Sequence, residues 1–467
     1  MSENINFIDE SFIEGLITET QNPPAPKIDE ILNKALQLQG LDLLDAAYLL
    51  NIKSGDLLNK LLHTAYQVKQ EIYGNRLVLF APLYISNFCS NNCLYCGFRV
   101  DNKDIVRRVL SLDEIKDETL SLLEQGHKRI LMLMGEHHKN CPFDYFLEAI
   151  NAAYSVKDKK CSSIRRINVE IAPLDENEFQ KLSKVHIGTY TVFQETYHRE
   201  TYSKMHPGGI KSDYNWRLST MDRALSNGMH DVGIGALFGL YDYRFEVLSL
   251  IQHAKHLDKK FNVGPHTISI PRIKPAKNAP ASFNLEHAVS DEEFKKLIAV
   301  IRCSVPYTGM ILSTREPAEL RSELFNYGIS QISAGSRTSP GGYKQAFSET
   351  EEAGQFSLND CRTSGEVIRD VIQHGFVPSF CTACYRLGRV GEDFMDKAKP
   401  GLIKLFCQPN ALTTLKEYLV DYADPETKQL GEELIQKELA TIPNDKVREK
   451  TGQNLIRIQQ GERDLYL

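Results

Sequence analysis

The chain has 467 residues, a mass of 53.0 kDa and a formal net charge of −6 at pH 7. Apolar residues make up 42% and charged residues 25%, proportions that exclude a disordered, collagen-like or coiled-coil protein. The acidic balance gives no electrostatic reason to expect nucleic acid or an anionic membrane as a partner. No apolar run approaches the roughly 20 residues of a membrane span, and the polar N-terminus does not resemble a secretory signal. We therefore expect a cytoplasmic protein.

The hydrophobic pattern divides the chain into three parts. Residues 1–75 carry leucines at helical spacing and predict a helical N-terminal extension. Over residues 76–375, short apolar runs alternate with amphipathic stretches, and eight such runs are typical of strands: 77–85, 129–134, 167–172, 188–193, 231–237, 264–270, 309–313 and 329–334. This alternation predicts an α/β fold, a complete (β/α)8 TIM-type barrel. An open doubly wound sheet is disfavoured because no GxGxxG follows the first strand. Residues 376–467 predict a mainly helical C-terminal extension.

Six of the ten cysteines form two groups, which in a chain without an export signal indicates metal binding rather than disulfides. The first group, Cys89, Cys93 and Cys96, has the spacing CxxxCxxC and follows the first predicted strand. Three thiolates can bind three irons of a [4Fe–4S] cluster and leave the fourth open to a small molecule. Structural zinc usually needs four protein ligands, so it fits less well. The loop would lie at the carboxyl end of the strands, where barrel active sites are found.

This cysteine loop, with an aromatic residue before its third cysteine, resembles that of the radical S-adenosylmethionine (SAM) enzymes. The resemblance implies that SAM chelates the open iron and is cleaved to a 5′-deoxyadenosyl radical, which abstracts hydrogen from a substrate. It places Tyr95 against the adenine, and it places Gly135 and Glu136 in the turn that faces the methionine amino group, although Met134 replaces the family's first glycine. We also expect two acidic residues at strand ends to contact SAM or to form internal ion pairs: Glu170 and Glu195.

The second group is Cys381, Cys384 and Cys407, with the spacing CxxC-x22-C. A thioredoxin-like dithiol would need a surrounding strand and helix pattern that is not found there. A zinc site is the other alternative. Three thiols again predict a [4Fe–4S] cluster with one open iron.

Together the two cysteine groups and the chain length resemble the HydG family, the tyrosine-cleaving maturases of [FeFe]-hydrogenase. The resemblance implies that L-tyrosine is cleaved at Cα–Cβ to p-cresol and dehydroglycine. Dehydroglycine is then converted to CO and cyanide at the C-terminal cluster, where they bind an additional iron together with free cysteine. It also implies an electron donor and other hydrogenase maturation proteins as partners. The related tyrosine lyase of thiazole synthesis, 2-iminoacetate synthase, shares the barrel but lacks the C-terminal cysteines.

Four further residues are predicted site residues. His266, in the segment Gly-Pro-His-Thr-Ile-Ser, matches the family's ligand to the additional iron, although a lone histidine in a strand is more often structural. Arg315 is the first candidate for binding the tyrosine carboxylate, with Ser336 assisting and Arg337 in reserve. An Arg–Glu pair at the barrel rim is the alternative role for Arg315.

Two alternatives to the maturase remain open, a lyase that stops at dehydroglycine and an iron–sulfur carrier or scaffold. A zinc hydrolase is a more distant possibility. Two clusters at opposite ends of one chain further suggest an internal path between them. The four isolated cysteines are expected to be buried apolar residues: Cys141, Cys161, Cys303 and Cys361.

Overall fold

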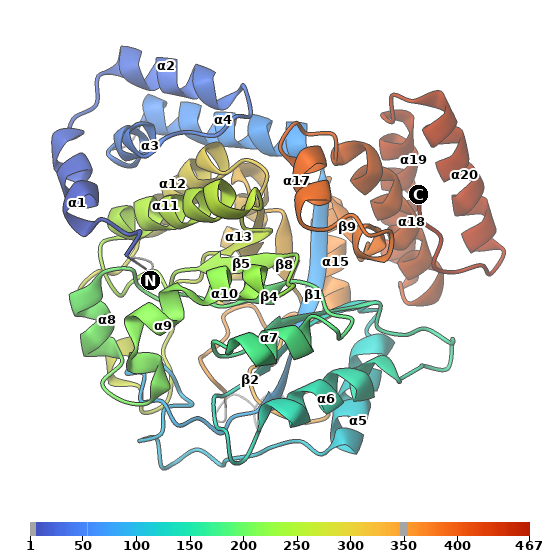
Figure 1. The fold of residues 1–467 in the computed structure, drawn as a ribbon. Helices are drawn as coiled ribbons and strands as arrows, with labels where there is room; N and C mark the ends of the chain where they lie inside the picture. The colour runs from blue at the N-terminus through green and yellow to red at the C-terminus, as the bar shows by residue number, and fades with distance from the viewer. Residues whose placement is uncertain (1–5, 54, 346–353) are drawn as a thin grey trace.

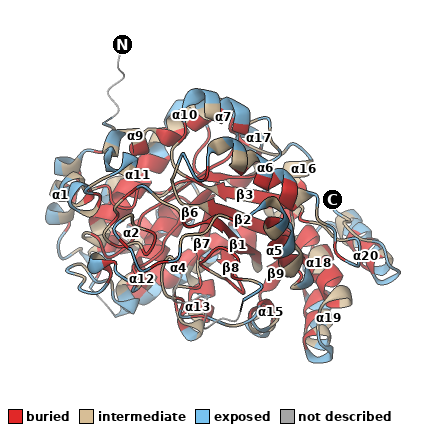
Figure 2. Cartoon of the chain, turned by 90° about the horizontal axis from the view of Figure 1, so that it is seen from below, coloured by how far each residue is buried: buried red, intermediate tan, exposed pale blue. Residues whose placement is uncertain are grey.

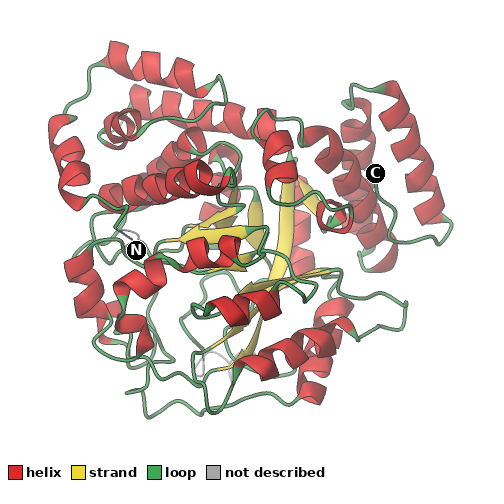
Figure 3. Cartoon of the chain, in the orientation of Figure 1, coloured by secondary structure: helices red, strands yellow, loops and turns green. Residues whose placement is uncertain are grey.

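The computed structural model describes residues 6–53, 55–345 and 354–467. Eight parallel strands form a closed barrel, in which β2 through β8 pair in order and β1 pairs with both β8 and β2 (Figures 1 and 3). The strands are β1 (Arg76–Ser86), β2 (Arg129–Met134), β3 (Arg166–Glu170), β4 (Tyr190–Thr191), β5 (Val232–Gly235), β6 (Thr267–Ser269), β7 (Gly309–Leu312) and β8 (Gln331–Ser333). The predicted (β/α)8 barrel is confirmed.

Strand β1 is much longer than the other strands because its apolar run is unbroken. Its second half pairs with β2, with Ala81 opposite Ile130, while its first half pairs with an additional short strand, β9 (Val377–Ser379). Ten of the eleven β1 residues are buried. The sequence did not indicate β9, because three residues are too few to show strand periodicity.

Helices surround the barrel, and three short ones follow β4 where a single helix would complete the repeat. The three short helices are α8 (Arg199–Met205), α9 (Tyr214–Leu218) and α10 (Thr220–Ser226). The other helices around the barrel are α5 (Leu112–Glu124), α6 (Phe143–Tyr154), α7 (Glu176–Leu182), α11 (Tyr243–Phe261), α12 (Asp291–Ser304), α13 (Ala318–Leu324) and α15 (Ser364–Gln373). The capping box that the sequence predicts at the start of α5 is present. Glu114 N donates to Ser111 Oγ and Ser111 N donates to the Glu114 carboxylate.

The N-terminal residues form four helices: α1 (Glu10–Glu19), α2 (Ala25–Ala35), α3 (Leu43–Leu50) and α4 (Asp56–Tyr73). Helix α4 packs against α12, and α1 and α3 pack against α11 (Figure 1). Their apolar faces are buried against the barrel helices, which matches the expected helical extension.

After β9 the chain is helical: α16 (Ala383–Arg386), α17 (Glu392–Ala398), α18 (Lys404–Asp421), α19 (Pro425–Ala440) and α20 (Asp445–Gln459). Helix α18 packs against β9, α19, α20 and α4, so it connects this extension to both the barrel and the N-terminal helices. Figure 2 shows buried residues concentrated in the strands and on the inward sides of the helices. In the described part of the chain, no helix is both long and apolar enough to cross a bilayer.

Candidate active site

The loop after β1 holds the first three cysteines against the turn that follows β2. Gly135 N donates to Ser86 O at 3.0 Å, and a Cβ atom at Gly135 would lie 2.2 Å from the Phe88 carbonyl oxygen. Only glycine fits this close backbone approach. Glu136 continues the contact, since its carbonyl oxygen accepts hydrogen bonds from both the backbone N and the Oγ of Ser90. The β2 turn therefore positions the cysteine loop.

Cys89, Cys93 and Cys96 line one cavity and all three are free thiols. Burial raises the pKa of Cys93 to about 12 and also raises that of Cys96. Buried neutral thiols lose their protons readily to a metal, because a bound cation stabilises the thiolate directly. This donor set fits a [4Fe–4S] cluster with one iron open. Among the described residues, no three His, Cys, Asp or Glu side chains are grouped in a way that could hold a single metal ion.

Glu195 lies on the wall of this cavity with two basic residues that the sequence did not single out. Lys211 Nζ donates to Glu195 Oε1 at 2.5 Å, and Arg217 Nη2 lies 3.6 Å from the same oxygen. Burial opposes ionisation of Glu195, but Lys211 and Arg217 outweigh it and lower its pKa. Glu195 also has φ of +73°, an unfavourable conformation for a non-glycine residue. The site is therefore charged and conformationally constrained.

Lys211 follows two glycines that bring its loop onto the cysteine loop. Gly208 O accepts a hydrogen bond from Asn92 N at 3.1 Å, and Lys211 N donates to Asn91 Oδ1 at 2.9 Å. Gly209 has φ of +89°, and a Cβ there would lie 2.2 Å from Asn91 Oδ1. A Gly-Gly pair shortly before a lysine, in the loop that follows α8, was the signal in the sequence that could have identified this loop.

Two other residues predicted to contact SAM, Glu170 and Tyr95, lie in different places relative to this cavity. Glu170 lines the cavity, and burial, followed by repulsion from Glu195, raises its pKa to about 7. Tyr95 packs behind the cysteine loop among Cys93, Leu237 and Ile273, outside the described residues that line the cavity. Its hydroxyl lies 2.8 Å from Nε2 of His206.

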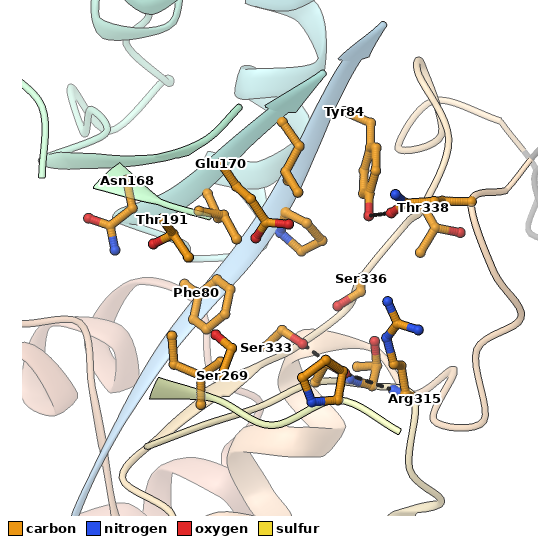
Figure 4. Close-up of a pocket in the computed structure, with 18 of the residues that line it drawn as sticks. Phe80, Tyr84, Asn168, Glu170, Thr191, Ser269, Arg315, Ser333, Ser336 and Thr338 are labelled. Carbon is orange, nitrogen blue, oxygen red and sulfur yellow. Dashed lines mark hydrogen bonds between the residues drawn. The ribbon is translucent and has the colours of Figure 1, made fainter. Parts of the chain in front are cut away.

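A second cavity occupies the middle of the barrel and shares residues with the first, including Tyr84, Glu170 and Gln355 (Figure 4). Gln355 connects the two chemically, because it accepts from the Tyr84 hydroxyl at 2.8 Å and donates to Cys96 Sγ at 3.7 Å. The wall combines aromatic and aliphatic side chains with hydroxyls and one guanidinium. Such a site suits a small amphipathic ligand that carries an acidic group.

Arg315 points into this middle cavity with its guanidinium 3.4 Å from the centre of the Phe356 ring (Figure 4). Its sequence neighbour Glu316 pairs instead with Arg272, through Nε at 3.1 Å, and with Lys274 at 3.2 Å. The rim ion pair thus forms without Arg315. The guanidinium remains available to a ligand carboxylate, which it can bind through two parallel hydrogen bonds.

Ser336 lies on the same wall, and its buried Oγ has no hydrogen-bond partner among the described residues. Arg337 follows it in sequence but is outside the described lining of this cavity, and its Nη1 donates to Ser336 O at 3.0 Å. The structure therefore brings Arg315 and Ser336 together and leaves Arg337 apart.

The second cysteine group lines a third cavity at the opposite end of the barrel, below the amino ends of the strands. Cys381, Cys384 and Cys407 line it together with His266, which immediately precedes β6. Burial raises the pKa of Cys384 to about 12, with Cys407 and Cys381 adding to the effect. Three thiols and an imidazole suit a cluster with an additional iron.

The three cavities follow one another along the barrel axis. The middle cavity shares Gln331 with the lower one and shares Glu170 with the upper one. Gln331 begins β8 and is 6% exposed. The cysteine groups thus lie at opposite ends of a series of adjoining cavities, as an internal path requires.

Two of the isolated cysteines correct the sequence-based expectation. Cys141 and Cys303 are buried, as predicted, but Cys161 and Cys361 are exposed. Cys161 has φ of +58° and lies in a turn, where a thiol is on the surface. Turn geometry, which hydropathy does not reveal, explains the exposure of Cys161.

A closed (β/α)8 barrel with three cysteines on the loop after its first strand, facing a polar cavity, defines a radical SAM enzyme. Residues 83–253 match the model of the radical SAM superfamily, and residues 269–377 match that of the biotin and thiamin synthesis associated domain.

The chain belongs to the HydG family of [FeFe]-hydrogenase maturases. A crystal structure of HydG, described as a maturase of the [FeFe]-hydrogenase, is 49% identical, with 99% of this chain and 100% of that chain covered and a TM-score of 0.94. HydG from Carboxydothermus hydrogenoformans is 41% identical over 97% of this chain and 99% of its own, with a TM-score of 0.84. The 2-iminoacetate synthase of Escherichia coli (strain K12) is 31% identical and covers 77% of this chain and 92% of its own.

Proposed function

We propose that this enzyme cleaves L-tyrosine at Cα–Cβ to p-cresol and dehydroglycine, and converts dehydroglycine to CO and cyanide for [FeFe]-hydrogenase assembly. The observation that carries the proposal is the position of two three-cysteine sites at opposite ends of adjoining cavities, with an arginine in the middle cavity. The 2-iminoacetate synthase alternative accounts for the upper two cavities but gives no role to the cysteines of the lower one.

The upper cavity would hold one [4Fe–4S] cluster through Cys89, Cys93 and Cys96, with SAM on the open iron. Together they supply a 5′-deoxyadenosyl radical, which is the cofactor's chemistry. The protein's contribution is to bind and orient SAM. We assign the contacts to backbone at Gly135, to the carboxylates of Glu136, Glu170 and Glu195, and to Tyr95 through the loop it supports.

The middle cavity would hold L-tyrosine. Arg315 binds the carboxylate, and the unpartnered Ser336 Oγ donates a further hydrogen bond to it. The aromatic and aliphatic wall excludes water and surrounds the phenol ring. Fixing the carboxylate at Arg315 holds the amino acid below Glu170 and Gln355, and therefore close to the upper cavity.

The lower cavity would hold a second [4Fe–4S] cluster through Cys381, Cys384 and Cys407, and His266 would ligate an additional iron that also takes free cysteine. Asp231 Oδ1 lies 3.4 Å from His266 Nδ1 and would orient the imidazole. In this proposal the catalytic barrel comprises residues 76–375. Residues 1–75 form a supporting extension, and residues 376–467 form the second cluster domain. We expect an electron donor and other hydrogenase maturation proteins as partners.

The proposal is tested with anaerobically reconstituted protein, dithionite, SAM and L-tyrosine, assayed together for p-cresol and CO. Both products support the maturase. p-Cresol without CO, from protein with both clusters present, would instead support the simpler lyase. Neither product from such protein would support a cluster carrier and overturn the tyrosine assignment.

A further inference from the structure

Two arginines line the lower cavity beside the cysteines. Arg76 begins β1 and Arg129 begins β2. Arg129 is only 5% exposed, and its Nε and Nη2 atoms are buried without a hydrogen-bond partner among the described residues, as is Nε of Arg76. The remaining part of the Arg129 side chain interacts with the hydroxyl of Tyr385, another residue that lines this cavity.

Two other buried arginines have strong partners within the fold. Arg302 donates to the carbonyl oxygens of Gly328, Pro306 and Thr308, and Arg321 pairs with Asp360. A buried guanidinium without a countercharge is strongly unfavourable. The fold therefore supplies partners for these arginines elsewhere and leaves Arg129 facing a cavity.

The surroundings affect the pKa values of the two arginines in opposite directions. For Arg76, burial lowers the pKa, but Cys407, Tyr73 and the other cysteines outweigh it and raise the pKa overall. For Arg129 burial dominates and the pKa is lowered.

The geometry points to Arg129, assisted by Arg76, as the binding site of a small α-imino or α-amino carboxylate in the lower cavity. This inference rests on the proposed function, in which dehydroglycine and free cysteine both carry such a group. A guanidinium binds a carboxylate through two parallel hydrogen bonds. A fragment released from Arg315 would then pass Gln331, which lines both cavities, and meet a second arginine beside the cysteines.

The first test measures binding without turnover, by calorimetry on cluster-loaded protein. Oxamate is an unreactive isostere of dehydroglycine, L-serine has the shape of cysteine without its thiol, and neutral oxamide is the control ligand. All measurements use an Arg315→Gln background, so that the middle cavity does not contribute. We expect Arg129→Gln to weaken binding of oxamate or L-serine at least tenfold, Arg129→Lys to weaken it less, and oxamide to be unaffected. The ligand whose binding is weakened by Arg129→Gln identifies the source of the carboxylate. Unchanged binding of both oxamate and L-serine overturns the inference.

The second test follows products in the single Arg129→Gln variant. We expect p-cresol to stay within about twofold of the wild type, CO and cyanide to fall at least tenfold, and glyoxylate to rise, because unbound dehydroglycine hydrolyses to glyoxylate and ammonia. A change in cluster content or potential with unchanged oxamate and L-serine binding would show that Arg129 only balances cluster charge, and would overturn the inference. Failure of the proposed function would look different, since the wild type would then make no p-cresol while the binding difference remained.

Discussion

The hydroxyl of Tyr385 lies 3.0 Å from Nε2 of His266, so the cysteine-bearing extension directly contacts the amino end of strand β6. The other ring nitrogen faces Asp231 Oδ1 at 3.4 Å. The imidazole is therefore held on both sides, and an iron bound at Nε2 would take the place of Tyr385. This contact joins the second cysteine group to the barrel directly at His266.

We predict that His266→Asn removes about one iron atom per chain while leaving both clusters and p-cresol formation intact, because His266 lies far from the SAM site. Asp231→Asn, which disturbs only the orientation of the ring, should weaken binding of that iron by roughly 10- to 100-fold. Iron and sulfide analysis together with EPR checks both. Loss of sulfide along with iron in His266→Asn would contradict the assignment.

Arg315→Lys should raise the KM for L-tyrosine by roughly 10- to 100-fold, equivalent to about 1.5–3 kcal/mol for a charge-assisted hydrogen bond. Lysine keeps the charge but loses the paired geometry. Steady-state p-cresol formation gives the KM. Arg337→Lys is the matched control, because Arg337 lies outside the described lining of the middle cavity. An equal effect at Arg337 would show that the cavity assignment is wrong.

Gly135→Ala should displace the first cysteine loop, since the added Cβ would lie 2.2 Å from the Phe88 carbonyl oxygen and 3.3 Å from Cys89 Cβ. We expect the EPR change caused by SAM binding to the reduced cluster to be lost, and p-cresol with it. Gly208→Ala is the control, because Gly208 also contacts the cysteine loop, through its carbonyl oxygen and Asn92 N, but a Cβ there meets nothing within 4 Å. A fully active Gly135→Ala enzyme would contradict the close packing described here.

Glu246 gives a pH-dependent prediction that is independent of the clusters. It is fully buried and accepts from Tyr197 N at 2.9 Å and from Thr196 Oγ1, and burial raises its pKa to about 8. Since the folded pKa exceeds the unfolded value of 4.5, the stability contribution is full below pH 4.5 and is lost as the pH rises through 8.

The Glu246→Gln variant, which lacks this titration, should therefore gain about 5 kcal/mol relative to the wild type between pH 4.5 and pH 9. The unfolding temperature of the two proteins, measured across this pH range under anaerobic conditions, reports the difference. Parallel pH profiles for the two proteins would refute the prediction.

The barrel was predictable because each of its strands carries an apolar run and each run is followed by a helical pattern. Strand ends were less predictable. Residues 188–193 read as a strand, but only Tyr190–Thr191 pair regularly, because loops at the carboxyl ends of strands are shaped by the site rather than by the sheet. Strand β9 escaped prediction because it is short and depends on pairing with the first residues of a long β1.

The cysteines were predictable because their spacing determines their chemistry. The sequence did not predict the basic residues of the cavities, because single basic residues carry no spacing signal. These residues are Lys211, Arg217 and Arg129. They reach the cavities only through tertiary packing, as when Gly209 brings Lys211 onto the cysteine loop. Residue type alone also could not separate Arg315, which lines the middle cavity, from Arg337, which does not.

The central claim is that the two cysteine groups perform successive parts of one reaction. The most direct measurement compares p-cresol and CO from the wild type and Cys381→Ala in the same anaerobic assay. We predict that Cys381→Ala forms p-cresol at a rate close to that of the wild type and loses CO, whereas Cys93→Ala loses both. Unchanged CO from Cys381→Ala, with the second cluster shown to be absent, would contradict the account.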